Sequence, residues 1–130
     1  MGAIAMHSIE ELTLYLREFA RARDWEQFHN PKNLCMALSI EVAEACEHFQ
    51  WLTPEQAQNL NSNQKEAVAL ELADIQMYLV RLADQLGIDI WQAINTKTQL
   101  NEAKYPAALV RGNAAKYTAY QQDLTSNKTS

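Results

Sequence analysis

The sequence has few of the residues that β structure requires. Its 130 residues include only three glycines and three prolines, whereas hairpins and tight turns depend on residues that adopt a positive or a fixed φ. Strand signals are also lacking, and no apolar run approaches the ~20 residues of a membrane-spanning helix. These absences favour a single all-α domain and give no reason to expect a membrane partner.

Cysteine is scarce as well. Cys35 and Cys46 lie eleven positions apart in one predicted helix, which separates them by about 16 Å at about 1.5 Å per residue, too far for a disulfide. We therefore expect buried, reduced thiols in a cytoplasmic protein. The first residues, MGAIAMHSIEE, lack the basic start and long apolar region of a signal peptide, which agrees with that location.

The charge is not that of a protein that binds nucleic-acid polymers. The net charge is −5, and such binding depends on Lys and Arg side chains that neutralise phosphates. A small anionic ligand held through a metal ion remains compatible with this charge.

Polar start signals divide the chain into predicted helices. Ser8 with Glu11, and Asn63 with Glu66, have the spacing of a capping box, and Asn30 precedes a proline. The signals predict helices over residues of about 9–23, 31–51, 54–60, 64–87 and 90–104. The four longer helices and their short connections predict an antiparallel four-helix bundle.

This bundle defines the expected domain organisation. Residues 1–106 form the helical domain, which Pro106 closes, and residues 107–130 form a polar tail. Two alternatives are open for the tail: it frays, or residues 117–122 form a short helix that docks on a partner subunit. The second and third long helices carry apolar residues on more than one face, which favours self-association.

Four acids stand out within these two helices. The segments EVAEACEHFQW and ELADIQMYLV each place two carboxylates three residues apart, Glu41 with Glu44 and Glu71 with Asp74. On a helical wheel, Glu41 falls inside an apolar stripe, and both Glu71 and Asp74 lie between apolar positions. At least three of the four acids are therefore expected not to be simply solvated.

A buried acid cluster has three ways to be stable. Burying an unpaired carboxylate costs several kcal/mol, and a second carboxylate beside it adds repulsion. The acids are protonated, or they pair with a cationic side chain such as Lys65 or Arg81, or they bind a cation. Carboxylates suit Mg²⁺ or Mn²⁺ bound together with substrate phosphates, and the three-residue spacing puts both acids of a pair on one helix face.

Other interpretations compete with this one. Each acidic spacing is common on exposed helix faces, so the metal hypothesis depends on finding two such pairs in successive long helices. A di-iron bundle requires a Glu-x-x-His from two helices, and the only such spacing, Glu26 with His29, lies before Pro31. A non-catalytic helical module that binds a nucleotide or a protein is the remaining alternative.

Four segments in order carry a family resemblance: RDWEQFHNPKNL, EVAEACEHFQW, ELADIQMYLVRLA and KTQLNEAKYP. They are similar to the all-α nucleoside triphosphate pyrophosphohydrolases of the MazG-like superfamily, most of all to the dCTP pyrophosphatase branch. The resemblance implies helical subunits assembled as a dimer or a tetramer. It also implies Mg²⁺-dependent cleavage between the α and β phosphates to a nucleoside monophosphate and pyrophosphate, which removes noncanonical or surplus nucleotides from the pool.

The resemblance also assigns roles to residues. Glu41, Glu44, Glu71 and Asp74 would hold the metal, with Mn²⁺ as an alternative to Mg²⁺, and Glu44 or Glu47 would orient or deprotonate the attacking water. The residues implied in substrate binding are Trp25, Trp51 and His29 for the base, Tyr78 for the sugar, and Lys97, Asn101 and Lys104 as donors to phosphate or base.

Three positions depart from the branch. This chain has Ala43 where relatives often carry Gly, Lys104 where they carry Arg, and Leu16 where some place a histidine near the base. Lysine keeps the charge but loses the two-pronged geometry of arginine, and Leu16 bears on the expected preference for dCTP-like or modified pyrimidine nucleotides. The sequence leaves open the preferred nucleotide, the number of metal ions, the general base and the choice between dimer and tetramer.

Overall fold

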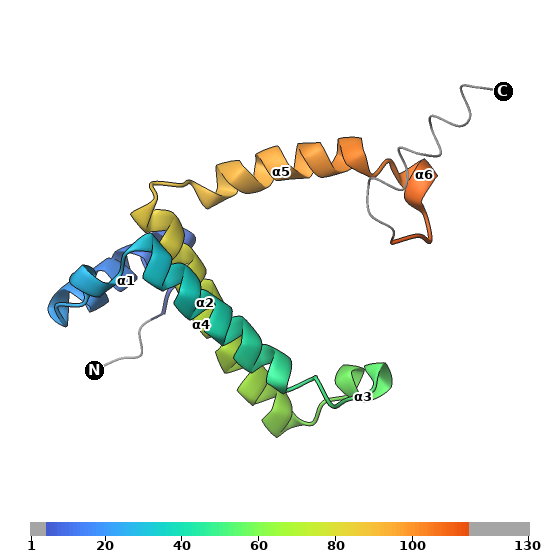
Figure 1. Ribbon diagram of the computed structural model, residues 1–130, viewed down its shortest axis with the longest axis horizontal. Coiled ribbons are helices and arrows are strands. Elements are labelled where there is room, and N and C mark those ends of the chain that lie inside the picture. Colours follow the sequence, from blue (N-terminus) through green and yellow to red (C-terminus); the bar gives the residue numbers. More distant parts are fainter. Residues whose placement is uncertain (1–4, 115–130) are drawn as a thin grey trace. The chain divides into compact units, whose positions relative to one another are not determined.

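The computed structural model describes residues 5–114, and every regular element in that range is a helix (Figure 1). The elements are α1 (Ile9–Ala22), the 3-10 helix η1 (Glu26–Phe28), α2 (Pro31–Glu47), α3 (Pro54–Gln58), α4 (Ser62–Gln85), α5 (Ile90–Lys104) and α6 (Ala107–Val110). The all-α prediction is confirmed. The helix expected at residues 117–122 lies outside the described range.

Side-chain caps start the long helices of the first part of the chain. The Ser8 hydroxyl accepts from the backbone amide of Glu11 at 3.1 Å, and the side-chain oxygen of Asn30 accepts from the backbone amide of Asn33 at 2.9 Å. Both starts are where the sequence predicts them, because a cap satisfies amides that have no partner within the helix.

The predicted start of α4 is wrong. The cap is Asn61, not Asn63, and it forms a reciprocal capping box with Gln64 in which both hydrogen bonds measure 2.9 Å. Two overlapping segments of the sequence have the capping-box spacing, and the structure uses the earlier one. The helix thereby gains two residues at its start.

Two predicted helix ends are also wrong. α2 ends at Glu47 instead of Trp51, and α3 ends at Gln58 instead of residue 60. After α2 the amides of His48 and Phe49 bond to carbonyls three residues back, at 3.2 and 3.0 Å, so the chain tightens into turns. The predicted left-handed end of α4 is confirmed, since Gly87 has φ of 65°.

The chain divides into two compact units, Met1–Asp89 and Ile90–Ser130. In the first unit, α2 and α4 lie side by side and run antiparallel, and α1 packs on α4 (Figure 1). Its most buried apolar side chains are Ala20 of α1, Leu34 of α2 and Val80 and Ala83 of α4. The long α2–α4 contact is the scaffold on which the acids of the two helices meet.

The second unit contains α5 and α6. Pro106, with φ of −57°, is the N-cap of α6, so the proline ends α5 as predicted and also starts a further short helix. Lys97, Asn101 and Lys104 lie on α5 at the predicted helical spacing.

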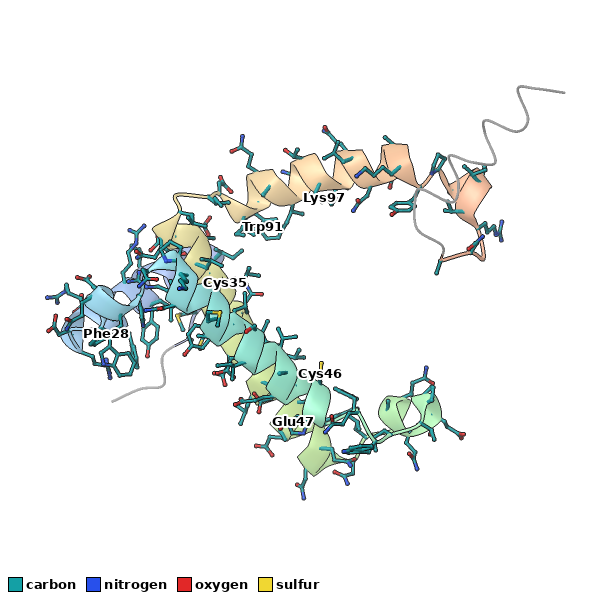
Figure 2. The ribbon with its side chains drawn as sticks, viewed as in Figure 1. Phe28, Cys35, Cys46, Glu47, Trp91 and Lys97 are labelled. Carbon is teal, nitrogen blue, oxygen red and sulfur yellow. The ribbon has the colours of Figure 1, made fainter. Side chains whose placement is uncertain are left out.

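Both cysteines differ from the sequence expectation in one respect. Cys35 and Cys46 are free thiols, as predicted, but they are exposed instead of buried (Figure 2). The two thiols are exposed because α2 carries apolar residues around much of its circumference, and α4 covers only one side. Among the described helices, none is long and apolar enough to cross a membrane.

Candidate active site

Three of the four predicted acids meet between α2 and α4. Carboxylate oxygens of Glu41, Glu44 and Glu71 all lie within 4.8 Å of one another. Glu41 and Glu44 are one helical turn apart on α2, and Glu71 faces them because the antiparallel α4 passes alongside. We call these three residues the acidic cluster.

Two oxygens of the acidic cluster are buried without a partner. Oε2 of Glu41 and Oε2 of Glu71 are shielded from solvent, and neither accepts a hydrogen bond. The arginine ion pairs of the described residues join Arg17 and Arg81 to Asp84, and Arg21 to Glu18, so they leave the cluster alone. An unsatisfied buried carboxylate oxygen is costly, and no arginine or lysine of the described residues forms an ion pair with the cluster.

The electrostatics agree with this shortage of positive charge. Burial, followed by the charge of Glu44 and a side-chain hydrogen bond with it, raises the pKa of Glu41 to about 7, and the charges of Asp74 and Glu71 add to the effect. Nε2 of His48 lies 3.7 Å from Oε1 of Glu71. At that distance a hydrogen bond is not formed.

The cluster fits a divalent cation. Its donors are all carboxylate oxygens, which hard cations such as Mg²⁺ and Mn²⁺ prefer, and the two partnerless oxygens come from opposite helices. Of the three ways to stabilise buried acids, pairing with Arg81 is excluded because Arg81 is engaged elsewhere. Protonation of Glu41 near pH 7 and binding of a cation remain, and a cation would displace the proton.

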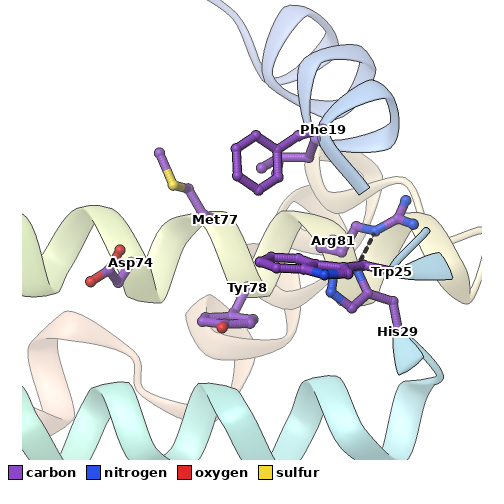
Figure 3. A pocket seen from close by; sticks show the side chains of 8 residues that line it. Phe19, Trp25, His29, Asp74, Met77, Tyr78 and Arg81 are labelled. Atoms are coloured by element: carbon purple, nitrogen blue, oxygen red, sulfur yellow. Dashed lines mark hydrogen bonds between the residues drawn. The ribbon is translucent and has the colours of Figure 1, made fainter. Parts of the chain in front are cut away.

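A pocket of about 150 Å³ opens beside the cluster. It is lined by Leu16, Phe19, Trp25, His29, Asp74, Met77, Tyr78 and Arg81 (Figure 3). The pKa of Tyr78 is raised by burial and then by the charges of Glu41, Asp74 and Glu44, so the pocket and the acids share one electrostatic environment. A ligand in this pocket would present one end to aromatic rings and the other to the acids.

Local backbone geometry builds the aromatic wall of the pocket. After α1, Asp24 has φ of 53°, a left-handed conformation that Asp tolerates better than most residues. The turn allows the Trp25 amide to bond to the Ala20 carbonyl at 2.9 Å. It brings the Trp25 ring 5.8 Å from Phe19 in an edge-on arrangement and 6.2 Å from His29.

A buried arginine forms the far end of the pocket. Arg81 is 5% exposed; its Nε donates to Nδ1 of His29 at 3.3 Å (Figure 3), and its NH1 donates to Asp84 at 3.3 Å. Arg17 also binds Asp84, with two hydrogen bonds of 2.8 and 2.5 Å. Burial and the charge of Arg81 lower the pKa of His29, which keeps the imidazole neutral.

The remaining predicted residues are distributed as follows. Asp74 is exposed and lines the pocket instead of joining the acidic cluster, so the expectation that it escapes solvent is wrong for this chain by itself. Trp51 is 86% exposed and is not among the pocket's lining residues. Glu47 is exposed at the end of α2 (Figure 2), and the three donors of α5 belong to the second unit.

Sequence reasoning missed three residues of the pocket: Phe19, Met77 and Arg81. Met77 and Arg81 follow Asp74 by three and seven residues on α4, which places all three on one helix face, so the periodicity contained this signal. Phe19 follows the apolar period of the first helix and so has no distinguishing signal; it becomes part of the pocket wall through the turn at Asp24, which brings the Trp25 ring against it. Leu16, noted as a departure from relatives, does line the pocket.

Comparisons with known proteins identify the family of the chain. The family model described as the MazG-like family matches residues 36–119. The chain is 42% identical to dCTP pyrophosphatase 1 of Bos taurus over 92% of this chain and 72% of that protein. It is 41% identical to dCTP pyrophosphatase 1 of Homo sapiens over 85% of this chain and 66% of that protein.

A solved structure gives the same answer for the fold. A pyrophosphatase from Archaeoglobus fulgidus superposes with a TM-score of 0.73 at 39% identity, covering 82% of this chain and 99% of that chain. The resemblance read from the sequence is confirmed, as is the prediction of an enzyme of the nucleoside triphosphate pyrophosphatase class. The chain belongs to the MazG-like family.

Proposed function

We propose that the protein is a Mg²⁺-dependent nucleoside triphosphate pyrophosphohydrolase that favours dCTP-like or modified pyrimidine deoxynucleotides. The observation that carries the proposal is the pair of buried, partnerless oxygens on Glu41 and Glu71. Buried carboxylate oxygens without a partner lower the stability of the folded chain. A bound cation would neutralise them, which explains why a cation site would retain them.

The proposed chemistry is hydrolysis at the α phosphorus. The oxygen of a water molecule bonds to this phosphorus while the bond to the bridging oxygen of the β phosphate breaks, which releases pyrophosphate. Glu41, Glu44 and Glu71 would hold Mg²⁺ or Mn²⁺, with Asp74 on the pocket side. When bound, the ion supplies charge neutralisation of the triphosphate and a lower pKa for water, and Glu44 or Glu47 would take the water's proton.

The pocket is proposed to hold the base and the sugar. Flat rings are good stacking platforms for a base, and Trp25 lies with its ring in this pocket between Phe19 and His29 (Figure 3). Tyr78 lines the same pocket as Trp25 and Asp74 (Figure 3), and it is proposed to contact the sugar. The dCTP pyrophosphatases among the relatives support a pyrimidine base, and a role in removing surplus or modified nucleotides would follow.

The proposed assembly is a homodimer or a homotetramer. Large apolar side chains on α2 and α4 are exposed: Met36 by 61%, Ile40 by 57%, Leu70 by 65% and Leu72 by 57%. Apolar surface of this kind favours association with a second copy. Lys97, Asn101, Lys104 and Trp51 are proposed to contact the substrate within that assembly.

The decisive experiment replaces Glu41 or Glu71 by Gln and measures pyrophosphate release with Mg²⁺. Each variant is expected to lose at least about 100-fold in kcat/KM, because a neutral amide is a poor ligand for a hard cation. Glu66→Gln is the matched control. Glu66 is an exposed acid on α4, the helix that carries Glu71, and its replacement should leave turnover unchanged.

The same experiment separates the enzyme from a non-catalytic binding module. Products of a panel of canonical and modified nucleotides are identified, so that pyrophosphate is distinguished from single phosphate. If the wild type releases no pyrophosphate from any of them, the module that binds nucleotide or protein is the better interpretation. If Glu41→Gln and Glu71→Gln retain full activity, the acidic cluster is not the catalytic centre.

A further inference from the structure

We propose that Arg81 is a positioning residue for recognition of the base: it holds His29 in the tautomer with its proton on Nε2, so that His29 donates a hydrogen bond to an acceptor on the base. The inference rests on the proposed function, because it takes the pocket to be the site of the base. It adds a specificity determinant to that function, from a residue outside the acidic motifs.

Arg81 acts through His29 because its own donors are largely occupied. Its Nε donates to His29 and its NH1 donates to Asp84. With the Gln85 amide flipped, so that its oxygen and nitrogen exchange places, the Gln85 oxygen accepts from both NH1 and NH2 at 3.3 Å. A guanidinium has five N–H donors, and these contacts fix its plane. The guanidinium of Arg81 is therefore a rigid part of the pocket, and His29 presents the polar atom that can contact a ligand.

The chemistry of the contact determines the tautomer. A guanidinium donates and never accepts, so Nδ1 of His29 must offer a lone pair to Nε of Arg81 (Figure 3). A neutral imidazole then carries its single proton on Nε2. The nearby positive charge of Arg81 and the partial burial of the ring both disfavour the imidazolium that would carry protons on both nitrogens.

The Arg81 arrangement is itself held from outside the pocket. Asp84 receives two hydrogen bonds from Arg17 in addition to the one from Arg81. Two arginines thus share one carboxylate, which anchors Arg81 on α4 while leaving an excess of positive charge at this end.

The consequence is a preference for a particular edge of the base. Among the other residues that line the pocket, Leu16, Phe19, Trp25 and Met77 offer no oxygen to this N–H, and the side-chain acceptors are the oxygens of Asp74 and Tyr78. A donor enclosed without an acceptor loses the free energy of its hydrogen bond to water. The base should therefore turn toward His29 a carbonyl oxygen or an unprotonated ring nitrogen, and not an amino group.

The experiment compares the wild type with Arg81→Met, Arg81→Lys and the control Arg21→Met. Methionine keeps much of the buried volume but removes the donor, lysine restores a donor, and Arg21 is an exposed arginine paired with Glu18 outside the pocket. Long-range ¹H–¹⁵N NMR of the free protein reads which nitrogen of His29 carries the proton, with His29→Gln used for assignment.

KM is then measured for dCTP and for its difluorobenzene isostere, which keeps the shape of the ring but lacks strong acceptors. In the wild type we expect the Nε2–H tautomer and a KM at least about tenfold higher for the isostere. In Arg81→Met both tautomers should appear and the ratio of the two KM values should fall at least threefold. Arg81→Lys should recover part of the ratio, and Arg21→Met should keep all of it.

The proposal is overturned if the wild type carries the proton on Nδ1, or if Arg81→Met keeps the wild-type ratio. Should Arg81→Met lose its helical spectrum, Arg81→Lys carries the comparison. If the wild type has the Nε2–H tautomer but releases no pyrophosphate, the proposed function fails by itself. In that case calorimetry gives the Kd values of dCTP and of the isostere. Equal values would refute the proposal that His29 recognises an acceptor on the base.

Discussion

The two ends of the α2–α4 pair treat buried charge in opposite ways. At one end, Glu41 and Glu71 each bury an oxygen that has no partner. At the other, Arg81 is almost fully buried, yet it is bound by Asp84 and His29. At the arginine end other side chains of the protein pair the buried charge, whereas at the acidic end the two oxygens have no partner among the described residues.

We interpret the paired charges of the arginine end as stabilising the fold, and the unpaired acids of the other end as binding a ligand. A paired buried charge resists the loss of either partner, whereas an unpaired cluster strains the fold until a counter-charge binds. Satisfied and unsatisfied polar groups on the same two helices therefore identify different tasks. Variants at the arginine end should cost stability, and variants at the acidic end should cost activity while relieving strain.

The largest effect on stability is expected from Asp84→Asn. The variant leaves Arg81 buried and Arg17 without their shared carboxylate, and loss of one partner of a buried pair typically costs several kcal/mol. We expect the free energy of unfolding to fall by about 3 kcal/mol, measured by urea denaturation monitored by circular dichroism.

The control for this prediction is Glu18→Gln. Glu18 forms the same kind of two-pronged contact with Arg21, but both side chains are exposed, and exposed pairs contribute little. No measurable change in stability is expected. Equal losses in the two variants would mean that burial does not distinguish the arginine end.

The next largest effect is stabilisation by Mg²⁺. An ion that binds only the folded state raises the free energy of unfolding by about 2.7 kcal/mol at 100 times its Kd. The thermal midpoint of the wild type should rise with Mg²⁺ concentration, and that of Glu71→Gln should rise much less. An identical rise in both proteins would place the ion somewhere other than the acidic cluster.

The two ends should also respond to pH with opposite sign. The pKa of Glu41 is raised from 4.5 to about 7 in the folded protein, so its contribution to stability is full below pH 4.5 and is lost as the pH rises through 7. The pKa of Asp84 is lowered from 3.8 by Arg17, chiefly through their hydrogen bond, so its contribution is present above pH 3.8 and is lost as the pH falls further.

Without metal, the free energy of unfolding should therefore decline between pH 4.5 and 7. We expect a loss of about 1.5 kcal/mol, roughly half of what the full pKa shift of Glu41 implies, because the side chain is partly accessible to solvent. Glu41→Gln should flatten this decline and Glu66→Gln should preserve it, in denaturation curves recorded with chelator. A decline that persists in Glu41→Gln would assign the proton to another group.

The contrast between the ends also explains what the sequence could predict. Local spacing predicts the helix starts at Ser8 and Asn30. The periodicity of two successive long helices predicts that Glu41 and Glu71 meet. The arginine end depends on pairs far apart in the sequence: Arg81 with His29, 52 residues away, and Arg17 with Asp84, 67 residues away. Such pairs have no local signature.

The failures have the same origin. Asp74 was placed by its apolar neighbours on a wheel, and the two cysteines were expected to be buried as reduced thiols usually are, but whether a given face of a helix is covered depends on the other helices that pack there. The start of α4 was misplaced for a different reason, because Asn61 and Asn63 have equivalent local signals. Packing and competing caps are decided by the whole fold.

The smallest effect is expected at the cap of α4, the helix that contributes to both ends. Asn61→Ala removes one side of the capping box and should lower the free energy of unfolding by about 1 kcal/mol, whereas Asn63→Ala, at an exposed position inside the first turn, should change it far less. Because the cap lies outside both sites, Asn61→Ala should leave the Mg²⁺-dependent rise of the thermal midpoint and the His29 tautomer as they are in the wild type. If Asn61→Ala weakened the Mg²⁺-dependent rise or changed the His29 tautomer, the position of α4 and not the local balance of charge would control the affected site.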